Sequence, residues 1–212
     1  MTPARGDHDA RRIEVSEAVW RVLAERGFGG LTLRAVAAEM QATTGLLTHY
    51  FPNKRALVAY ALDVLERRSE ERPRPAAAVA AAARAEAPAL ETGASALKML
   101  RAVLLDILPL TPESRAGNRI WVGSWDVALA DPELAAEHAE RYRRSRERIA
   151  GLVAAAQRAG ALPGDRTAAE LAASAQSYVL GLVVQALLAP QEFSPERQTV
   201  LLDTYLEALR SA

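Results

Sequence analysis

The sequence predicts an all-α protein, and three features of its 212 residues support this prediction. Alanine occurs 45 times, and leucine, arginine and glutamate are also abundant, all of which favour helix. The β-branched and aromatic residues that favour strands are sparse. Apolar residues recur at spacings of three and four, as on one face of a helix, in segments that prolines separate. We expect nine helices and no strand.

The amino-terminal part of the chain predicts four tightly connected helices. The first has one apolar face, made of Val15, Ala18, Val19, Val22 and Leu23. Gly27 supplies a left-handed stop to this helix. Thr32 and Thr43 are suitable N-caps for two short helices, and Asn53 is suitable for a fourth. Pro73 ends the fourth helix.

The rest of the chain predicts longer and more apolar helices. An alanine-rich stretch at 76–93 reads as a weak helix within a linker. Further helical patterns lie at about 95–108, 113–130, 132–160, 167–189 and 195–210. We therefore expect one domain at 1–52 and a larger one at 53–212, in which residues 53–72 form a connecting helix.

Composition excludes several classes of protein. Zero cysteines rule out disulfides and thiolate chemistry, and with three histidines we expect no dense metal cluster. The longest apolar run, 178–189, is shorter than the ~20 residues that span a bilayer, and the amino terminus lacks a secretory pattern. The sequence contains no phosphate loop and no catalytic triad, so we expect no enzyme, cofactor or metal. We also expect a soluble cytoplasmic protein without membrane contact. Lys plus Arg equal Asp plus Glu at 26 each, but a DNA reader needs only a local cationic stripe.

Residues 32–51 predict a helix, a tight turn and a second helix. A short helix that reads base edges in the roughly 12 Å major groove needs small or polar side chains on its exposed side. That side would carry Thr43, Thr44, Gly45, Thr48 and His49, whereas Ala42, Leu47 and Phe51 would face the core. Lys54 would add a cation at the start of the next helix. The alternative is that two short capped helices serve only as structure, as in many all-helical proteins.

Three ordered strings in this region resemble one family. They are LAERG at 23–27, LTLRAVAAE at 31–39 and GLLTHYFPNKRAL at 45–57. The segment from Val15 to Leu65 resembles the DNA-binding domain of TetR-family transcriptional regulators, and residues 97–190 resemble the ligand and dimerisation domain of the BetI-like branch. The resemblance implies a nine-helix TetR-type fold with an amino-terminal helix-turn-helix domain. The implied DNA-binding residues are Thr32, Thr43, Thr44, Gly45, Leu46, Thr48, His49, Tyr50 and Lys54.

Two positions depart from the family pattern. The family usually has glycine in the turn, where this chain has Gln41, and the turn accommodates Gln41 if its backbone is not left-handed. The family usually has tyrosine where this chain has Thr48, although a hydroxyl residue there is similar to the BetI-like branch. Base contacts at Thr48 therefore cannot be transferred from members with tyrosine.

Candidate ligand-binding residues lie on two later helices. Trp121 and Trp125 are spaced i, i+4 beside Asp126, and aromatic rings with a carboxylate suit a cationic or aromatic ligand. The alternative is that both tryptophans fill the core. Gln176 and Tyr178 are polar groups on an apolar helix, where they would orient a ligand, fill a dimer seam or face water.

The final two helices are the candidate dimer interface. In the family they pair with those of a second subunit as a four-helix bundle, and Gly181 permits close approach. The residues expected there are Leu171, Ala175, Leu182, Ala186, Leu201 and Tyr205; the alternative is an intramolecular core.

The predicted function is a homodimeric repressor that a small-molecule effector releases from a palindromic DNA operator. The alternative is a helical small-molecule binding module without DNA-binding activity.

Overall fold

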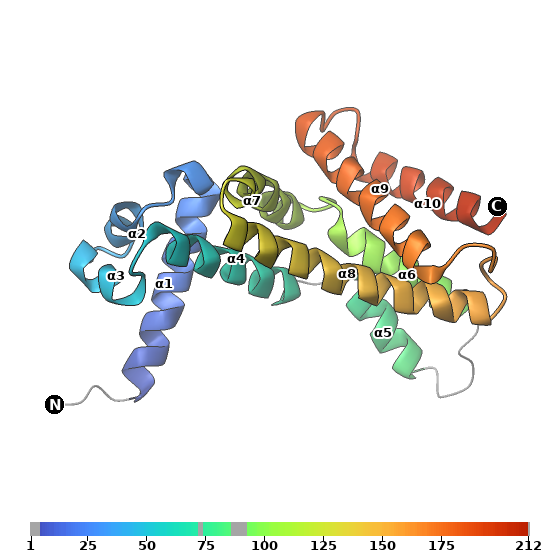
Figure 1. Ribbon diagram of the computed structural model, residues 1–212, viewed down its shortest axis with the longest axis horizontal. Coiled ribbons are helices and arrows are strands. Elements are labelled where there is room, and N and C mark those ends of the chain that lie inside the picture. Colours follow the sequence, from blue (N-terminus) through green and yellow to red (C-terminus); the bar gives the residue numbers. More distant parts are fainter. Residues whose placement is uncertain (1–4, 72–73, 86–92, 212) are drawn as a thin grey trace. The chain divides into compact units, whose positions relative to one another are not determined.

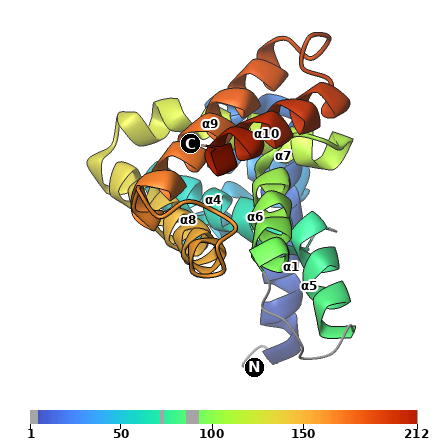
Figure 2. The same cartoon turned by 90° about the vertical axis from the view of Figure 1, so that its right-hand side faces the viewer.

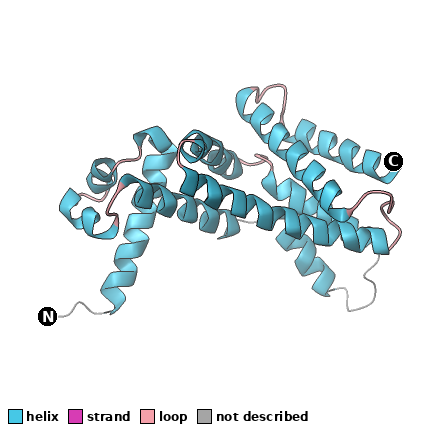
Figure 3. Ribbon diagram, viewed as in Figure 1, coloured by secondary structure: helices cyan, strands magenta, loops and turns pink. Residues whose placement is uncertain are grey.

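The computed structural model describes residues 5–71, 74–85 and 93–211, and within these it contains helices and no strand (Figure 3). This confirms the all-α prediction. A short 3-10 turn, η1, follows the first helix at Phe28–Gly30. The α-helices are α1 (Arg5–Arg26), α2 (Leu33–Glu39), α3 (Thr44–Tyr50), α4 (Lys54–Glu71), α5 (Pro75–Ala85), α6 (Gly93–Ile107), α7 (Pro112–Leu129), α8 (Pro132–Arg158), α9 (Ala168–Leu188) and α10 (Pro195–Ser211).

Helix α5 corrects the predicted number of nine helices to ten within the described residues. It occupies the alanine-rich stretch that the sequence predicted as a weak helix within a linker, and it lies beside α6 in both Figure 1 and Figure 2. Ala76 is buried, and its amide donates to the Asp106 carboxylate of α6 at 3.2 Å. Alanine is the best helix former, but a short helix needs a packing partner, which α6 supplies.

The chain divides into two compact units. The first, here called the amino-terminal unit, comprises residues 1–72 and 119–136. The second, here called the carboxyl-terminal unit, comprises residues 73–118 and 137–212. Helices α7 and α8 each contribute residues to both units. The physical reason is packing, because Ile120, Ala128 and Leu134 belong to the same buried cluster as the short helices.

The core of the amino-terminal unit holds the short helices in place. Helix α1 packs against α2 and α4, and α2 packs against α3. Leu23 of α1, Leu47 of α3, and Leu57 and Leu62 of α4 are almost completely buried in one cluster. Arg21 of α1 also pairs with Glu39 of α2 at 2.5 Å. These contacts fix α3 although it has only seven residues.

The carboxyl-terminal unit is built on α6, α9 and α10, which contact one another. Leu104, Val179 and Leu202 are fully buried where these helices meet. The Arg101 guanidinium of α6 donates to both carboxylate oxygens of Asp203 in α10, at 2.5 and 2.9 Å. These hydrogen bonds raise the pKa of Arg101, which therefore stays charged.

Helix α9 begins with a capping box, in which the Thr167 hydroxyl accepts from the Glu170 amide while the Glu170 carboxylate accepts from the Thr167 amide.

Among the described helices, α9 is the one long and apolar enough to cross a membrane by length and composition. The sequence did not indicate this, because the apolar stretch that it singled out, 178–189, has only 12 residues. However, 44 % of the apolar stretch of α9 is buried inside the chain, and the core helices of soluble proteins have the same composition.

The backbone of two turns has positive φ where the sequence placed special residues. Gly27 has φ 61° after α1, a positive value that suits glycine, but its ψ of −170° lies outside the left-handed helical region that the sequence predicted for this stop. Gln41 has φ 51°, so its backbone is left-handed and the condition under which the turn would accommodate a glutamine is not met. The turn from α2 to α3 requires this conformation, because the Ala42 amide must reach back to the Ala37 carbonyl, at 2.9 Å.

Candidate nucleic-acid interface

Two threonines stand at the starts of α2 and α3, and the structure gives them different roles. The Thr32 hydroxyl accepts from the Ala35 amide at 3.0 Å and so caps α2, as predicted. Thr43 occupies the N-cap position of α3, but its side chain makes no capping hydrogen bond, and its carbonyl accepts from the Leu46 amide instead. The exposed Thr43 hydroxyl is therefore available to an external group.

Helix α3 has one polar exposed side and one buried side, as its sequence predicted. We call the exposed side the recognition face; its residues are Thr43, Thr44, Gly45, Thr48 and His49, and all five are exposed. Leu47 and Phe51 are buried in the core of the amino-terminal unit, and Ala42 packs against that core. The buried side fixes the rotation of α3, so the recognition face points away from the core.

Thr48 has a defined hydrogen-bonding capacity. Its hydroxyl donates to the Gly45 carbonyl at 2.9 Å, within the same helix. The hydroxyl proton is therefore in use, while the oxygen lone pairs and the methyl group face solvent. In the major groove such a group accepts from an adenine or cytosine amino group, or its methyl contacts that of thymine.

The carboxyl-terminal end of α3 is aromatic. His49 is exposed and meets the half-buried Tyr50 edge to face, with ring centroids 6.0 Å apart. Tyr50 packs against the core, and the Phe51 ring lies 5.1 Å from that of Tyr60 in α4. Leu46 is half-buried. Among these residues the structure leaves His49 most accessible, and it gives Tyr50 a packing role.

Lys54 begins α4 at a position that is unfavourable for helix stability. The Asn53 side chain accepts from the Ala56 amide at 2.9 Å and caps the helix, but its first turn contains no acidic residue. A cation there opposes the helix dipole by about 0.3–1 kcal/mol. Arg55 in the same turn pairs with Glu133, whereas exposed Lys54 has no ion-pair partner among the described residues. A phosphate group would turn this repulsion into attraction.

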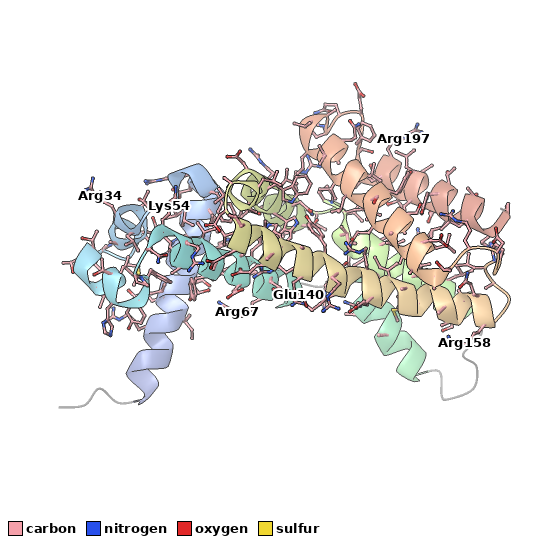
Figure 4. All side chains as sticks on the ribbon, in the orientation of Figure 1. Arg34, Lys54, Arg67, Glu140, Arg158 and Arg197 are labelled. Atoms are coloured by element: carbon pink, nitrogen blue, oxygen red, sulfur yellow. The ribbon has the colours of Figure 1, made fainter. Side chains whose placement is uncertain are left out.

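Sequence reasoning missed Arg34 as a candidate cation. Arg34 is exposed in the first turn of α2 and extends outward from the helix (Figure 4). No ion pair forms to it among the residues that the structure describes. The sequence could have indicated Arg34, because it lies two residues after the N-cap Thr32. This spacing places Arg34 in the first turn of α2, on a different side of the helix from the buried Val36. Arg34 and Lys54 together supply local positive charge in a chain whose formal net charge is zero.

The five predicted ligand-binding residues divide between the two units. Trp121, Trp125 and Asp126 lie on the part of α7 that belongs to the amino-terminal unit, where Trp121 packs against the core and Asp126 is exposed. Gln176 and Tyr178 lie on α9 in the carboxyl-terminal unit. Trp121 therefore fills space at the core, which is the alternative that the sequence left open for the two tryptophans.

Gln176 and Tyr178 make contacts within their own unit. The buried Gln176 side chain accepts from Arg146 at 3.1 Å and donates to the Tyr142 carbonyl at 3.3 Å, which joins α9 to α8. Tyr178 stacks on Tyr205 with centroids 4.3 Å apart and donates to the Leu201 carbonyl at 2.9 Å. Burial raises the pKa of the Tyr178 hydroxyl, which keeps it a donor.

The residues expected at a dimer interface lie mostly inside the chain. Leu171, Ala175, Leu182 and Ala186 are each at most 6 % exposed, because α6 and α10 cover that side of α9. Leu201 and Tyr205 are half-buried, and Tyr205 donates to Ser174 at 2.9 Å. Exposed apolar side chains occur elsewhere on the same helices, at Leu188 (79 %) and Val200 (54 %).

Within the described part of the chain, no three His, Asp or Glu side chains gather in a way that holds a metal ion. The organised feature is a capped seven-residue helix with a polar face, packed behind a second helix and followed by Lys54. This arrangement defines a helix-turn-helix DNA-binding protein.

Residues 16–61 match the family described as bacterial regulatory proteins, tetR family, and residues 96–211 match BetI-type transcriptional repressor, C-terminal. The chain belongs to the TetR family of transcriptional regulators, with a BetI-type carboxyl-terminal domain.

Curated relatives agree with this assignment. The chain is 28 % identical to the HTH-type transcriptional regulator BetI of Burkholderia thailandensis over 207 residues, which cover 98 % of this chain and 97 % of that protein. It is 37 % identical to the HTH-type transcriptional regulator PksA of Bacillus subtilis over 70 residues, a match that spans 33 % of this chain and only 34 % of PksA. Both relatives are named as transcriptional regulators.

Solved structures show the same fold. A transcriptional regulator from Rhodococcus sp. Rha1 has a TM-score of 0.74 at 21 % identity, covering 93 % of this chain and 95 % of the other. A putative transcriptional regulator from Saccharomonospora viridis, solved in complex with choline, has a TM-score of 0.73 at 21 % identity, covering 94 % and 96 %. The helix order and packing of this chain are therefore those of TetR-type regulators.

The first prediction concerns Lys54, and the chain offers a matched control because Lys98 is its only other lysine. Lys54→Ala should weaken DNA binding about tenfold and lower the slope of log affinity against log salt by about 1 per subunit, since one phosphate contact is lost. Thermal stability should stay equal or rise slightly, because the cation opposes the α4 dipole. Lys98 is exposed on α6, and Lys98→Ala should change neither quantity. Fluorescence anisotropy at several salt concentrations measures both variants, and equal slopes for both would remove Lys54 from the interface.

Proposed function

We propose that this protein is a cytoplasmic homodimeric repressor that binds a palindromic operator and is released by a small molecule. The observation that carries the proposal is the recognition face: five exposed small or polar positions on a helix whose other side is locked by Leu47 and Phe51. Such a helix reads base edges in the major groove. A carboxyl-terminal half of BetI type supports repression and ligand response.

The DNA contacts follow from the chemistry of each group. Thr44, Thr48 and His49 are assigned to base edges, with Gly45 allowing the backbone close to the groove. Thr43 and Lys54 are assigned to phosphate, as a hydroxyl donor and a cation respectively. Thr32 fixes the start of α2 and donates its hydroxyl proton to phosphate, and Arg34 adds a second cation. Leu46 and Tyr50 contribute apolar surface and packing at the rim of the face.

One recognition helix reads too few bases for a unique site, so two copies are required. A two-fold dimer places its recognition helices roughly 34–36 Å apart, in successive major grooves. The proposed dimer face is the exposed side of α9 and α10, because the opposite side is already buried within the chain. This face is defined by Ala173, Ser177, Gly181, Leu188 and Val200, which are all exposed.

For the effector we propose a small organic cation, with choline as the first compound to test. The support is the structural neighbour from Saccharomonospora viridis, whose crystals contain choline, and the aromatic ring of Trp125 with Asp126 beside it on α7. Aromatic faces bind quaternary ammonium groups by cation–π attraction. Helices α7 and α8 contribute to both compact units, so a ligand on α7 has a covalent path to the DNA-binding helices.

The test of the DNA-binding function is in-vitro selection from random duplex DNA, at roughly 50 and 200 mM salt. We expect an enriched palindrome whose half-sites are about one helical turn apart, because two recognition faces related by a two-fold axis read it. Failure to enrich any sequence at either salt concentration would contradict the proposal. In that case the helical small-molecule binding module becomes the better interpretation.

The dimer face is tested at Gly181, with Gly151 as its matched control. Both glycines are exposed within helices of the carboxyl-terminal unit, and a Cβ at either would meet nothing within 4 Å. Gly181→Arg should give a folded monomer with at least tenfold weaker binding to the palindrome, because a long cation blocks close helix approach. Gly151→Arg should remain dimeric. Sedimentation velocity distinguishes the two results, and a dimeric Gly181→Arg would place the interface elsewhere.

The effector proposal predicts reciprocal coupling. Choline should weaken operator binding by some factor, and operator should weaken choline binding by the same factor. Trp125→Leu should weaken choline binding about 5- to 30-fold, as expected for a desolvated cation–π contact worth about 1–2 kcal/mol. Trp20→Leu should not, because Trp20 lies beneath Arg68 at 4.7 Å in the helix-turn-helix core. Titration calorimetry measures both; independent binding of choline and operator would contradict this mechanism.

A further inference from the structure

Gln41 is the one non-glycine residue with positive φ in the described part of the chain. It lies in the turn between α2 and α3, where its amide donates to the Ala38 carbonyl at 3.1 Å and the Ala42 amide donates to the Ala37 carbonyl at 2.9 Å. This pair of hydrogen bonds is the Schellman motif, whose left-handed position normally carries glycine. A side chain with a Cβ is disfavoured there by its contact with the following carbonyl oxygen.

The same chain forms this motif with glycine at the end of α8. Gly160 has φ 70°, its amide donates to the Gln157 carbonyl at 3.0 Å, and the Ala161 amide donates to the Ala156 carbonyl at 2.8 Å. The two turns therefore have the same hydrogen bonds and the same backbone hand. The difference is that one turn carries a strained glutamine where glycine would be relaxed. Strain of this kind is a sign of a functional side chain.

The Gln41 side chain does nothing for the fold that the described residues show. It is exposed, and its carboxamide has no hydrogen-bond partner among them. The residues on either side face inward, since Met40 is buried and Ala42 packs against the core. Gln41 therefore extends a free amide group into solvent two residues before Thr43, where the recognition face begins.

We propose that the Gln41 carboxamide donates a hydrogen bond to a DNA phosphate at the edge of the major groove that α3 enters. This proposal rests on the DNA-binding function proposed above. In helix-turn-helix proteins the second helix contacts bases while the first crosses the backbone, so the turn between them lies next to phosphates. A neutral amide makes such a contact without displacing a counterion, unlike Lys54. Gln41 thus positions the protein on the DNA through a phosphate contact that a glycine at this place in the turn cannot make.

Two substitutions separate the amide from the backbone strain. Gln41→Ala removes the amide but keeps a Cβ in the left-handed turn, whereas Gln41→Gly removes both. Each should weaken binding to the selected palindrome about tenfold, the lower end of what a hydrogen bond to a charged group contributes. The salt slope and the preferred bases should stay unchanged, because the glutamine side chain is uncharged, releases no counterion and reads no base. Gln41→Gly should also raise the melting temperature above that of Gln41→Ala, since the strain is relieved.

Anisotropy titrations at several salt concentrations, repeated selection and thermal melts provide these readouts on the full chain. The proposal is overturned if both variants bind DNA as tightly as the wild type. It is also overturned if only Gln41→Gly weakens binding, because turn geometry would then be responsible, or if the preferred bases change, because Gln41 would then read a base. Wild-type protein that selects no DNA sequence would instead refute the proposed function, and the Gln41 contact with it.

Discussion

The structure depends on burying one side of a helix that is too short to be stable alone. Helix α3 has seven residues, well below the ~12–15 that an isolated helix needs to be even marginal in water. Leu47 is completely buried and Phe51 nearly so, and α2 packs behind them through the turn at Gln41. These contacts fix both the existence and the rotation of α3. The recognition face is polar because packing needs only the opposite side, which leaves the exposed positions free for reading bases.

Electrostatics at the interface are local and oppose helix stability. The chain has no net charge, so it lacks long-range attraction to DNA of the kind that a basic domain provides. Lys54 occupies the helix end that repels cations, next to Arg55, which Glu133 neutralises. A helix selected for stability alone would carry an acid in that turn. The strained backbone at Gln41 follows the same logic, since both residues reduce the stability of the free protein where DNA is expected to lie.

The division of the chain gives the proposed effector response a structural path. Residues 119–136 fall in the BetI-type domain by sequence, yet they pack into the core of the helix-turn-helix unit through Ile120, Ala128 and Leu134. Helices α7 and α8 therefore contribute to the sensing domain and to the DNA-binding unit. By linkage, a ligand that favours one arrangement of these helices changes the affinity for DNA, and DNA changes the affinity for the ligand equally.

Local spacing and capping chemistry were enough to predict the all-α class, most of the helices, the caps at Thr32 and Asn53, and the exposed and buried sides of α3. Periodicity shows that a helix has an apolar side, but it does not say what covers that side. Only tertiary structure decided that Leu171 and Ala186 face the chain's own core, that α5 has a partner in α6, and that Gln41 is left-handed. Each of these depends on which segments distant in sequence pack together, and local patterns carry no information about that choice.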